Sequence, residues 1–272
     1  MKLPTREITP TLATAPPMSR AEALAVAERC IELLRTRFGA RRVIVFGSAA
    51  GQGPWHAGSD LDLAVECIRP AEFLDAYGAV QDLAPPNLKV DLVELETAYP
   101  EMRARILREV AVPDDPILAL QGLVADELTT LERISAKMNE LTGEMHDPPT
   151  WVEMSAMGRL IHDFYRGAES LLSRIAVQFD GSVSATPHWH SELVAQMGRA
   201  QPGKRPAVID KRLLARLDEY RKLFHFFRNA YGAELEWDRL QKHVVQMSET
   251  LDMLRAQLDQ FFVAVQPKEE RS

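Results

Sequence analysis

The sequence predicts an α+β fold in which a small mixed sheet domain is followed by an all-helical bundle. Strand and helix patterns alternate over the first part of the chain, a stretch with two prolines and two acids at 112–116 interrupts both, and only helical periodicity follows. We therefore expect four segments: a flexible arm at 1–18, the sheet domain at 19–113, the helical bundle at 114–265 and a tail at 266–272.

The composition of the chain is that of a globular protein and argues against several other classes. Of the 272 residues 46% are hydrophobic and 26% are charged, as in ordinary globular proteins, and the net charge of −7 gives no overall basic footprint for nucleic acid. The two cysteines, Cys30 and Cys67, form no Cys-x-x-Cys, which argues against a zinc ribbon and for a reducing compartment. No apolar run approaches the roughly 18 residues of a membrane span, and the N-terminal stretch lacks a signal-peptide core. We expect a cytoplasmic protein that does not bind membranes.

The expected elements of the sheet domain follow from periodicity and caps. A helix begins after Ser19, a good N-cap residue, and ends near Phe38, before Gly39. The stretch 43–46 is short, apolar and rich in β-branched residues, so we expect it to be a central strand. Further strands are expected at 61–65 and 89–95, and further helices at 71–83 and 100–111.

The second half of the chain predicts a bundle of four or five helices. Apolar residues recur at helical spacing, and loops rich in Pro, Gly and Ser separate the periodic stretches. We expect helices at about 117–142, 150–179, 191–198, 209–231 and 236–264.

Candidate functional residues gather around the first two strands. Asp60 and Asp62 are two residues apart, so in a strand both carboxylates face the same way and repel each other unless a cation neutralises them. The turn at Gly47 and Ser48 offers backbone N–H groups to phosphate oxygens, and Asp91 adds a third carboxylate. An Asp-x-Asp pair alone is often only an acidic strand start. Together with the turn and Asp91 it indicates a site for Mg²⁺ (or Mn²⁺) and phosphoryl or nucleotidyl transfer, with two metals in the usual scheme.

The order of these motifs resembles a known family. Phe-Gly-Ser at 46–48, Ser-Asp-Leu-Asp-Leu at 59–63 and Val-Asp-Leu-Val at 90–93 resemble the DNA-polymerase-β-like nucleotidyltransferases, most closely the minimal nucleotidyltransferase group. The resemblance covers about residues 19–112. It implies an ATP substrate, catalytic metal ligands at Asp60, Asp62 and Asp91, and a phosphate contact at Gly47 and Ser48. The group often has an arginine directly after Gly-Ser, where this chain has Ala49.

The helical half carries a stripe of potential cations. On a helix Arg221, His225 and Arg228 share one face, a pattern that can bind the phosphates of a nucleotide or RNA. The alternative is a solvated basic face beside Asp218 and Glu234.

Around this stripe the sequence resembles a second family. The segment 220–232, together with Tyr-Arg-Gly-Ala-Glu at 165–169 and Trp-His at 189–190, resembles the HepT-like branch of the HEPN superfamily. These domains are all-helical, often dimerise, and often accompany minimal nucleotidyltransferases in toxin–antitoxin modules. There the HEPN protein is a ribonuclease, and its partner adenylylates one of its tyrosines. The resemblance thus implies a candidate homodimer through the helical domain and RNA as a candidate partner.

The HEPN signature Arg-x-x-x-x-His-x-Tyr is only partly present. With its tyrosine at Tyr231, Phe224 takes the arginine position and Asn229 the histidine position. This departure argues against ribonuclease activity, although His225 and Arg228 could substitute. The tyrosine that could accept a nucleotide is retained.

Two smaller constellations have alternative readings. Tyr165 and Glu169, one helical turn apart, either hydrogen-bond to the cationic stripe or leave Glu169 exposed. His188 and His190 could bind a metal, but packing and capping are favoured because Glu192 is the only acid close in sequence.

The sequence is compatible with three functions. The leading one is Mg²⁺-dependent transfer of AMP from ATP to a hydroxyl, with Tyr231 of its own or a partner's helical domain as one acceptor. The second is nucleotidylation of a small molecule, as in kanamycin-type resistance enzymes. The third is a non-catalytic module that binds a nucleotide or RNA and keeps a degenerate ribonuclease site.

Overall fold

The computed structural model describes residues 18–52, 55, 59–109, 113, 115–184, 186, 188–229 and 236–266, with the backbone alone at 227–229. The predicted arm and tail therefore lie almost entirely outside the described residues. The chain forms two compact units, Met1–Leu107 and Arg108–Ser272. The first holds a small mixed sheet and the second is helical, which confirms the α+β prediction. The exact domain limits of 113 and 114 stay a prediction, since residues 110–112 and 114 are not described.

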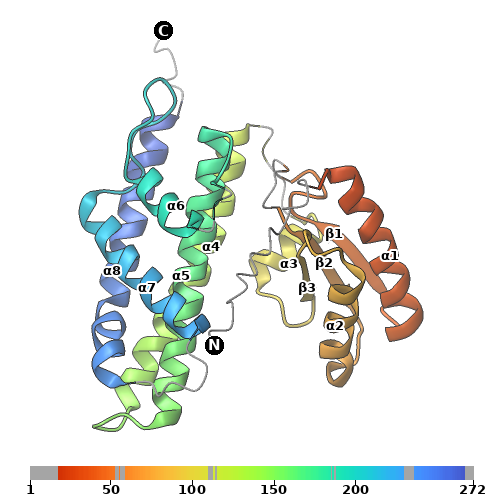
Figure 1. Ribbon diagram of the computed structural model, residues 1–272, viewed down its shortest axis with the longest axis horizontal. Helices are drawn as coiled ribbons and strands as arrows, with labels where there is room; N and C mark the ends of the chain where they lie inside the picture. Colours follow the sequence, from red (N-terminus) through yellow and green to blue (C-terminus); the bar gives the residue numbers. More distant parts are fainter. Residues whose placement is uncertain are drawn as a thin grey trace, which may run out of the picture. The chain divides into compact units, whose positions relative to one another are not determined.

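The first unit contains a three-stranded sheet with order β1-β2-β3 (Figure 1). β1 runs antiparallel to β2, and β2 runs parallel to β3. The elements in chain order are α1 (Arg20–Phe38), β1 (Arg42–Phe46), β2 (Leu61–Glu66), the short η1 (Pro70–Glu72), α2 (Phe73–Leu83), β3 (Val90–Glu94) and α3 (Pro100–Ile106).

The prediction that strand 43–46 is central was wrong. β2 lies between the other two strands, while β1 pairs with β2 alone in the described sheet. An apolar, β-branched stretch cannot distinguish these places, because β1 also has both its faces partly covered, with Val43 in one apolar cluster and Ile44 beside another.

Local signals fix both ends of α1. The Ser19 side chain accepts from the backbone N–H of Glu22 and the Glu22 carboxylate reaches back to Ser19, a complete capping box. Gly39 ends the helix in the left-handed conformation (φ 66°). Only residues 39–41 connect α1 to β1, so the two run in opposite directions. The first turn of α1 therefore lies at the end of β1, where the candidate phosphate turn begins.

The two faces of the sheet have different cover. One face packs against α1 and α2 in a single apolar cluster that includes Leu61, Leu63 and Val90. The other face carries Ala64, which clusters with Leu95 and with Ile106 of α3. Because Asp62 is two residues from Ala64, it shares the α3 face. Asp62 is half-buried and is not part of that apolar cluster.

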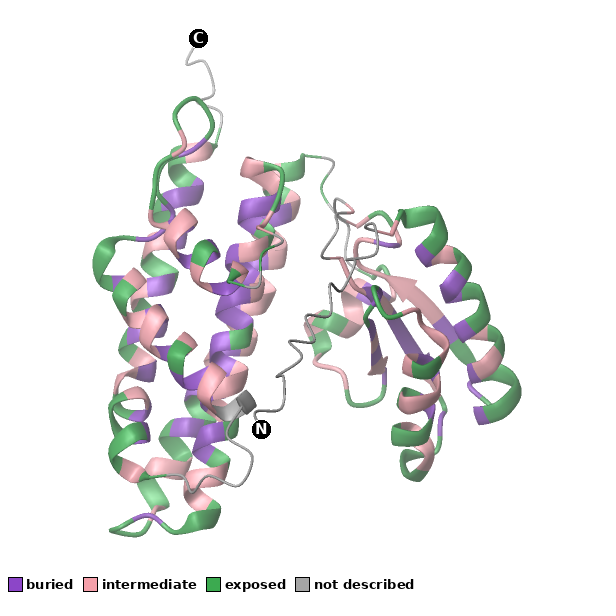
Figure 2. Cartoon of the chain, in the orientation of Figure 1, coloured by how far each residue is buried: buried purple, intermediate pink, exposed green. Residues whose placement is uncertain are grey.

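Over the residues that the structure describes, the second unit is a bundle of five helices: α4 (Pro116–Glu144), α5 (Trp151–Asp180), α6 (Trp189–Met197), α7 (Lys211–Asn229) and α8 (Trp237–Val265). α5 contacts all the others, and one apolar cluster runs through the whole bundle. Figure 2 shows buried residues along α5 and along the inner sides of its neighbours. None of the helices among the described residues has the length and apolar character needed to cross a membrane.

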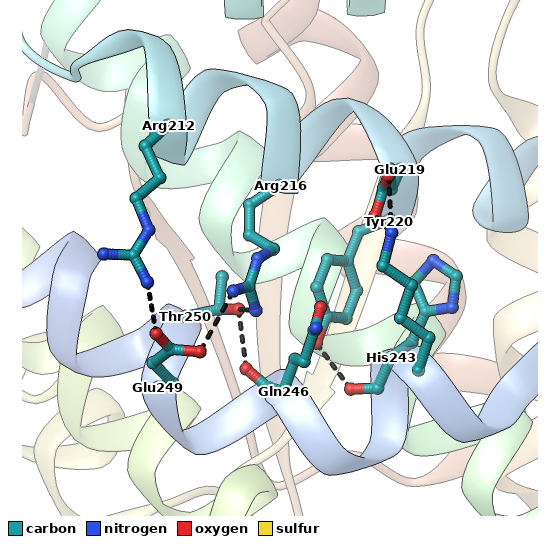
Figure 3. Close-up of polar contacts among 9 residues, drawn as sticks. Arg212, Arg216, Glu219, Tyr220, His243, Gln246, Glu249 and Thr250 are labelled. Carbon is teal, nitrogen blue, oxygen red and sulfur yellow. Dashed lines mark hydrogen bonds and ion pairs between the residues drawn. The ribbon is translucent and has the colours of Figure 1, made fainter.

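Polar contacts join α7 to α8, from the exposed Arg212 to the largely buried Arg216 and the buried Tyr220 (Figure 3). Arg212 and Arg216 both pair with Glu249, at 2.5 and 3.0 Å. Deeper in the interface the buried Tyr220 hydroxyl donates to the His243 carbonyl at 2.6 Å. Exposed ion pairs add little to stability, so the buried tyrosine and the apolar contacts are what hold α7 on α8.

Candidate functional site

The register of the sheet places two of the candidate carboxylates side by side. Asp62 on β2 pairs directly with Asp91 on the parallel strand β3. Neighbouring strands are about 4.8 Å apart, so the two side chains leave the same face as close neighbours. Asp60 directly precedes β2 and is two residues from Asp62. All three predicted carboxylates thus lie at one end of the sheet.

A lysine that the sequence analysis did not single out lies between two of these acids. Lys89 Nζ is 2.6 Å from Asp91 Oδ1 and 3.3 Å from Asp60 Oδ2. The three side chains are 31%, 40% and 45% exposed for Asp91, Asp60 and Lys89, so the cluster is open to solvent. Asp60 and Asp91 therefore converge on one shared positive charge.

Gly47 joins the turn after β1 to the carboxylates. Its φ of 67° is in the left-handed region, and a Cβ there would lie 2.1 Å from Asp62 Oδ2. The backbone N–H of Gly47 donates to Gln52 Oε1 at 2.8 Å, and its carbonyl accepts from the N–H of Gln52 at 3.0 Å. The predicted phosphate turn is therefore in direct contact with Asp62. Its Gly47 N–H is occupied by an amide side chain that a phosphate oxygen could replace.

Asp60, Asp62 and Asp91 supply the kind of oxygen ligands that a divalent cation would take. Among the described residues no group of three or more Asp, Glu, His or Cys side chains is arranged to hold a metal ion. The Lys89 ammonium nevertheless shows that Asp60 and Asp91 reach a common cation, with Asp62 next to Asp91. Carboxylates that are partly exposed to water suit Mg²⁺, which keeps several waters and binds through few protein ligands.

In the helical unit the predicted cationic stripe is partly neutralised. Arg221 pairs with Asp218 at 2.8 Å, and Lys222 pairs with the same carboxylate at 2.7 Å. For Arg221 the structure agrees with the alternative interpretation, a basic face beside Asp218. The Arg228 side chain and Tyr231 lie outside the described residues, so their predicted roles remain predictions.

The signature position held by Phe224 belongs to the core. Phe224 is buried, stacks on His162 with ring centroids 4.6 Å apart, and contacts Tyr165 at 5.3 Å. His225 meets His190 edge-on at 4.9 Å. A charged side chain at this buried position would lose its hydration, so the phenylalanine is explained by packing.

The reading that leaves Glu169 exposed was wrong; Arg221 of the stripe pairs with Asp218 instead, and the Arg228 side chain lies outside the described residues. Glu169 is 7% exposed, and a single carboxylate oxygen accepts from the Tyr165 hydroxyl at 2.9 Å and from His190 Nδ1 at 2.6 Å. Burial, with the adjacent Glu169 charge, raises the pKa of Tyr165 far above its ordinary range. The cluster links α5 to α6, and the Trp189 ring stacks on His190 at 3.8 Å. His190 thus serves packing, as favoured. His188 caps α6 without a side-chain hydrogen bond.

The comparisons with known proteins agree with both halves of this structure. Residues 28–112 match the family model described as polymerase beta, nucleotidyltransferase, so the sheet unit is a polymerase-β-type nucleotidyltransferase domain. Residues 156–265 match the family model of HepT-like proteins. The chain is accordingly a fusion of a nucleotidyltransferase domain with a HepT-like domain of the HEPN type. Comparison with curated proteins and with solved structures gave no match.

Three residues around the turn and the carboxylates escaped the sequence analysis. Lys89 precedes its strand by one residue, and Gln52 lies in a loop with no periodicity. Arg20 is 29 residues from the carbonyl that it binds. Lys89 alone could have been found, because a strand places residues i and i+2 on one face and so puts it beside Asp91.

Proposed function

We propose that this protein transfers a nucleoside monophosphate, AMP from ATP, to a hydroxyl group, with Mg²⁺ or Mn²⁺ as the cofactor. The observation that carries the proposal is the contact of Gly47 with Asp62, beside the Asp62–Asp91 pair. It brings a phosphate-binding turn and paired carboxylates to one end of the sheet. The nucleotidyltransferase family match supports the class of reaction.

The residues divide the chemistry among them. Ser48 and the backbone of the turn bind the β- and γ-phosphates, and Asp60, Asp62 and Asp91 hold the metal. When bound, the metal neutralises phosphate charge and lowers the pKa of the attacking hydroxyl. Asp91 orients that hydroxyl and takes its proton. The oxygen then bonds to the α-phosphorus as the bond to pyrophosphate breaks, so one pyrophosphate leaves for each monophosphate transferred.

Tyr231 is our first candidate for the acceptor hydroxyl, in its own chain or in a partner chain. It takes the tyrosine position of the HEPN signature, and it lies within residues 156–265, which match the HepT-like family model and follow the nucleotidyltransferase domain in the same chain. The module would then regulate its helical half by AMPylation, as in a toxin–antitoxin pair.

Pyrophosphate release from ATP and Mg²⁺ by the purified full chain tests the reaction. We expect release by the unmodified protein and at least a hundredfold less with Asp62→Asn, since removing a group that stabilises the transition state costs about two to four powers of ten. Asp82→Asn, an exposed change on α2, is the matched control. Equal rates for Asp62→Asn and the unmodified chain would refute the assignment, and Tyr231→Phe reports separately on the acceptor.

Nucleotide binding without turnover is the second candidate. Lys89 forms ion pairs with Asp60 and Asp91, and the Gln52 side chain accepts the hydrogen bond of the Gly47 N–H. Some of the charges and hydrogen-bond donors of the site thus already have partners within the chain. This candidate predicts that ATP raises the melting temperature while no pyrophosphate is formed.

A further inference from the structure

Arg20, the first residue of α1, reaches the turn that follows β1. Its Nε donates to the Ala49 carbonyl at 2.8 Å. A Cβ built on Gly51 would lie 3.1 Å from Arg20 Nη2 and 3.9 Å from Nη1, so the guanidinium lies over the end of the turn. The antiparallel arrangement of α1 and β1 brings these residues together.

The charge of Arg20 is not neutralised in the described part of the chain. Arg20 forms no ion pair there, and the nearby Glu22 is bound to the Ser19 backbone N–H at 2.8 Å and hydroxyl at 2.7 Å. A cation is also disfavoured at a helix N-terminus, where the helix dipole is already positive. The first turn of α1 therefore holds a guanidinium, without an ion-pair partner among the described residues, against the backbone of the turn.

The turn itself offers hydrogen-bond donors to an anion. Its internal bonds use the N–H groups of Ala50, Gly51 and Gln52. The backbone N–H groups of Ser48 and Ala49 have no acceptor among the residues that the structure describes. Two adjacent N–H groups beside a fixed guanidinium form an arrangement that binds phosphate.

We propose that Arg20 binds the β- or γ-phosphate of the nucleoside triphosphate, with the Ser48 and Ala49 N–H groups as its partners. The Nε–H anchors the guanidinium to Ala49, and the two terminal nitrogens remain for a fork-like contact with phosphate oxygens. The cation beside this turn is therefore Arg20 of α1. Residue 49, directly after Gly47 and Ser48, is a fully buried alanine and supplies no charge. The proposal rests on the proposed function, because it assigns a residue to the triphosphate of that reaction.

Equilibrium dissociation constants for ATP and AMP test this proposal. They are measured by calorimetry with Ca²⁺, which suppresses turnover. For Arg20→Gln we expect ATP to bind about tenfold or more weakly and AMP to bind unchanged, since a hydrogen bond to a charged group contributes about 1.5–3 kcal/mol. Arg20→Lys keeps the charge without the fork and should recover part of the affinity. The matched control is Arg29→Gln, an exposed change on the same helix.

Each outcome separates this inference from the function on which it rests. If the unmodified chain binds no ATP, the proposed function fails and Arg20 has no triphosphate to bind. If it binds ATP and Arg20→Gln binds ATP equally well, the function stands and Arg20 is excluded. Equal losses for ATP and AMP would show that Arg20 only holds the turn in shape, which also contradicts a phosphate contact.

Discussion

At the scale of single residues, Gly47 is the position where backbone geometry and chemistry depend on each other most. Its positive φ and its approach to Asp62 leave no room for a side chain. We predict that Gly47→Ala costs roughly 1–3 kcal/mol of stability through backbone strain, and that it reduces nucleotidyl transfer further because Asp62 must move. Gly78→Ala on α2, where a Cβ meets nothing within 4 Å, is the control. Unfolding in urea and transfer rates are measured in parallel for both variants. Unchanged stability and an unchanged transfer rate for Gly47→Ala would contradict the prediction.

Lys89 allows a prediction about the metal without any turnover. Its ammonium holds the place that a cation shared by Asp60 and Asp91 would take. We expect Lys89→Met to tighten Mn²⁺ binding, measured by electron paramagnetic resonance, by up to about fivefold, because a half-exposed ion pair contributes about 0.2–1 kcal/mol. Arg42→Met removes the same charge at the far end of β1 and should change little. Weaker Mn²⁺ binding by Lys89→Met would mean that the lysine organises the carboxylates for the metal.

The environment of His243 predicts that the stability of the helical unit depends on pH. Burial lowers its pKa, and the carbonyl of Arg239, which accepts from Nδ1 at 3.2 Å, opposes this only in part. Nε2 is buried without a hydrogen-bond partner. Because the folded pKa is below the ordinary value of about 6.5, the unfolded chain binds the proton more tightly. Stability is therefore complete above that value and falls as the pH drops below it.

Unfolding in urea at pH 7.5 and 5.5 checks this dependence. The unmodified chain should lose more stability between the two values than His243→Phe, which keeps a ring against Tyr220. The control is the exposed His188→Gln, which should behave like the unmodified chain. Identical pH profiles for His243→Phe and the unmodified chain would contradict the assignment.

At the scale of elements, the loop between α6 and α7 is fixed by one buried ion pair. The Arg205 side chain is fully buried and bonds to Asp180 at the end of α5 through Nε at 2.9 Å and Nη2 at 2.6 Å. It also donates to the carbonyls of Arg199, Pro206 and Gln196. All five N–H donors of the guanidinium are thus used within the fold.

Replacing Arg205 should leave Asp180 as a buried unpaired charge. We predict that Arg205→Met destabilises the helical unit by about 3–5 kcal/mol, the usual cost of breaking a buried pair from one side. The control Arg212→Met breaks an exposed pair with Glu249 and should cost about 1 kcal/mol or less. Chemical denaturation followed by circular dichroism measures both, and equal losses would refute the distinction.

The secondary structure of this chain was largely predictable, and the reasons are local. Ser19 and Gly39 bracket α1, Thr150 and Gly181 bracket α5, and the long helices have continuous apolar periodicity. The strand order was not predictable, because pairing depends on contacts between distant segments. β1 is the more apolar of the two and was predicted to be central, whereas β2, which carries Asp62, lies in the middle.

The candidate site was predictable only where its parts are close in sequence. Asp60 and Asp62 come from one motif, and the register then confirms that Asp91 is the direct neighbour of Asp62. Arg20 and the Glu169–His190 pair come together only through tertiary packing, so no spacing rule could have paired them. Glu169 was ambiguous because a glutamate on a helix is usually exposed unless a partner is available.

At the scale of the whole molecule, the chain joins a nucleotidyltransferase domain to a HepT-like domain. The two units have separate cores, one built on the sheet and one on five helices. Each can therefore be varied on its own. Changes at Asp62 should spare the bundle, and changes at Arg205 should spare the metal binding that we propose for the first unit. What links them functionally, in our proposal, is a hydroxyl on the helical half.

Following the α- and γ-phosphates of ATP separately tests the central claim most directly. The full chain is incubated with Mg²⁺ and with ATP labelled at either the α- or the γ-phosphate. The proposed reaction transfers the α-label to an acceptor and releases the γ-label as pyrophosphate, and Asp62→Asn should reduce both at least a hundredfold. Transfer of the γ-label, or α-label transfer that survives Asp62→Asn, would show that this group of carboxylates does not catalyse nucleotidyl transfer.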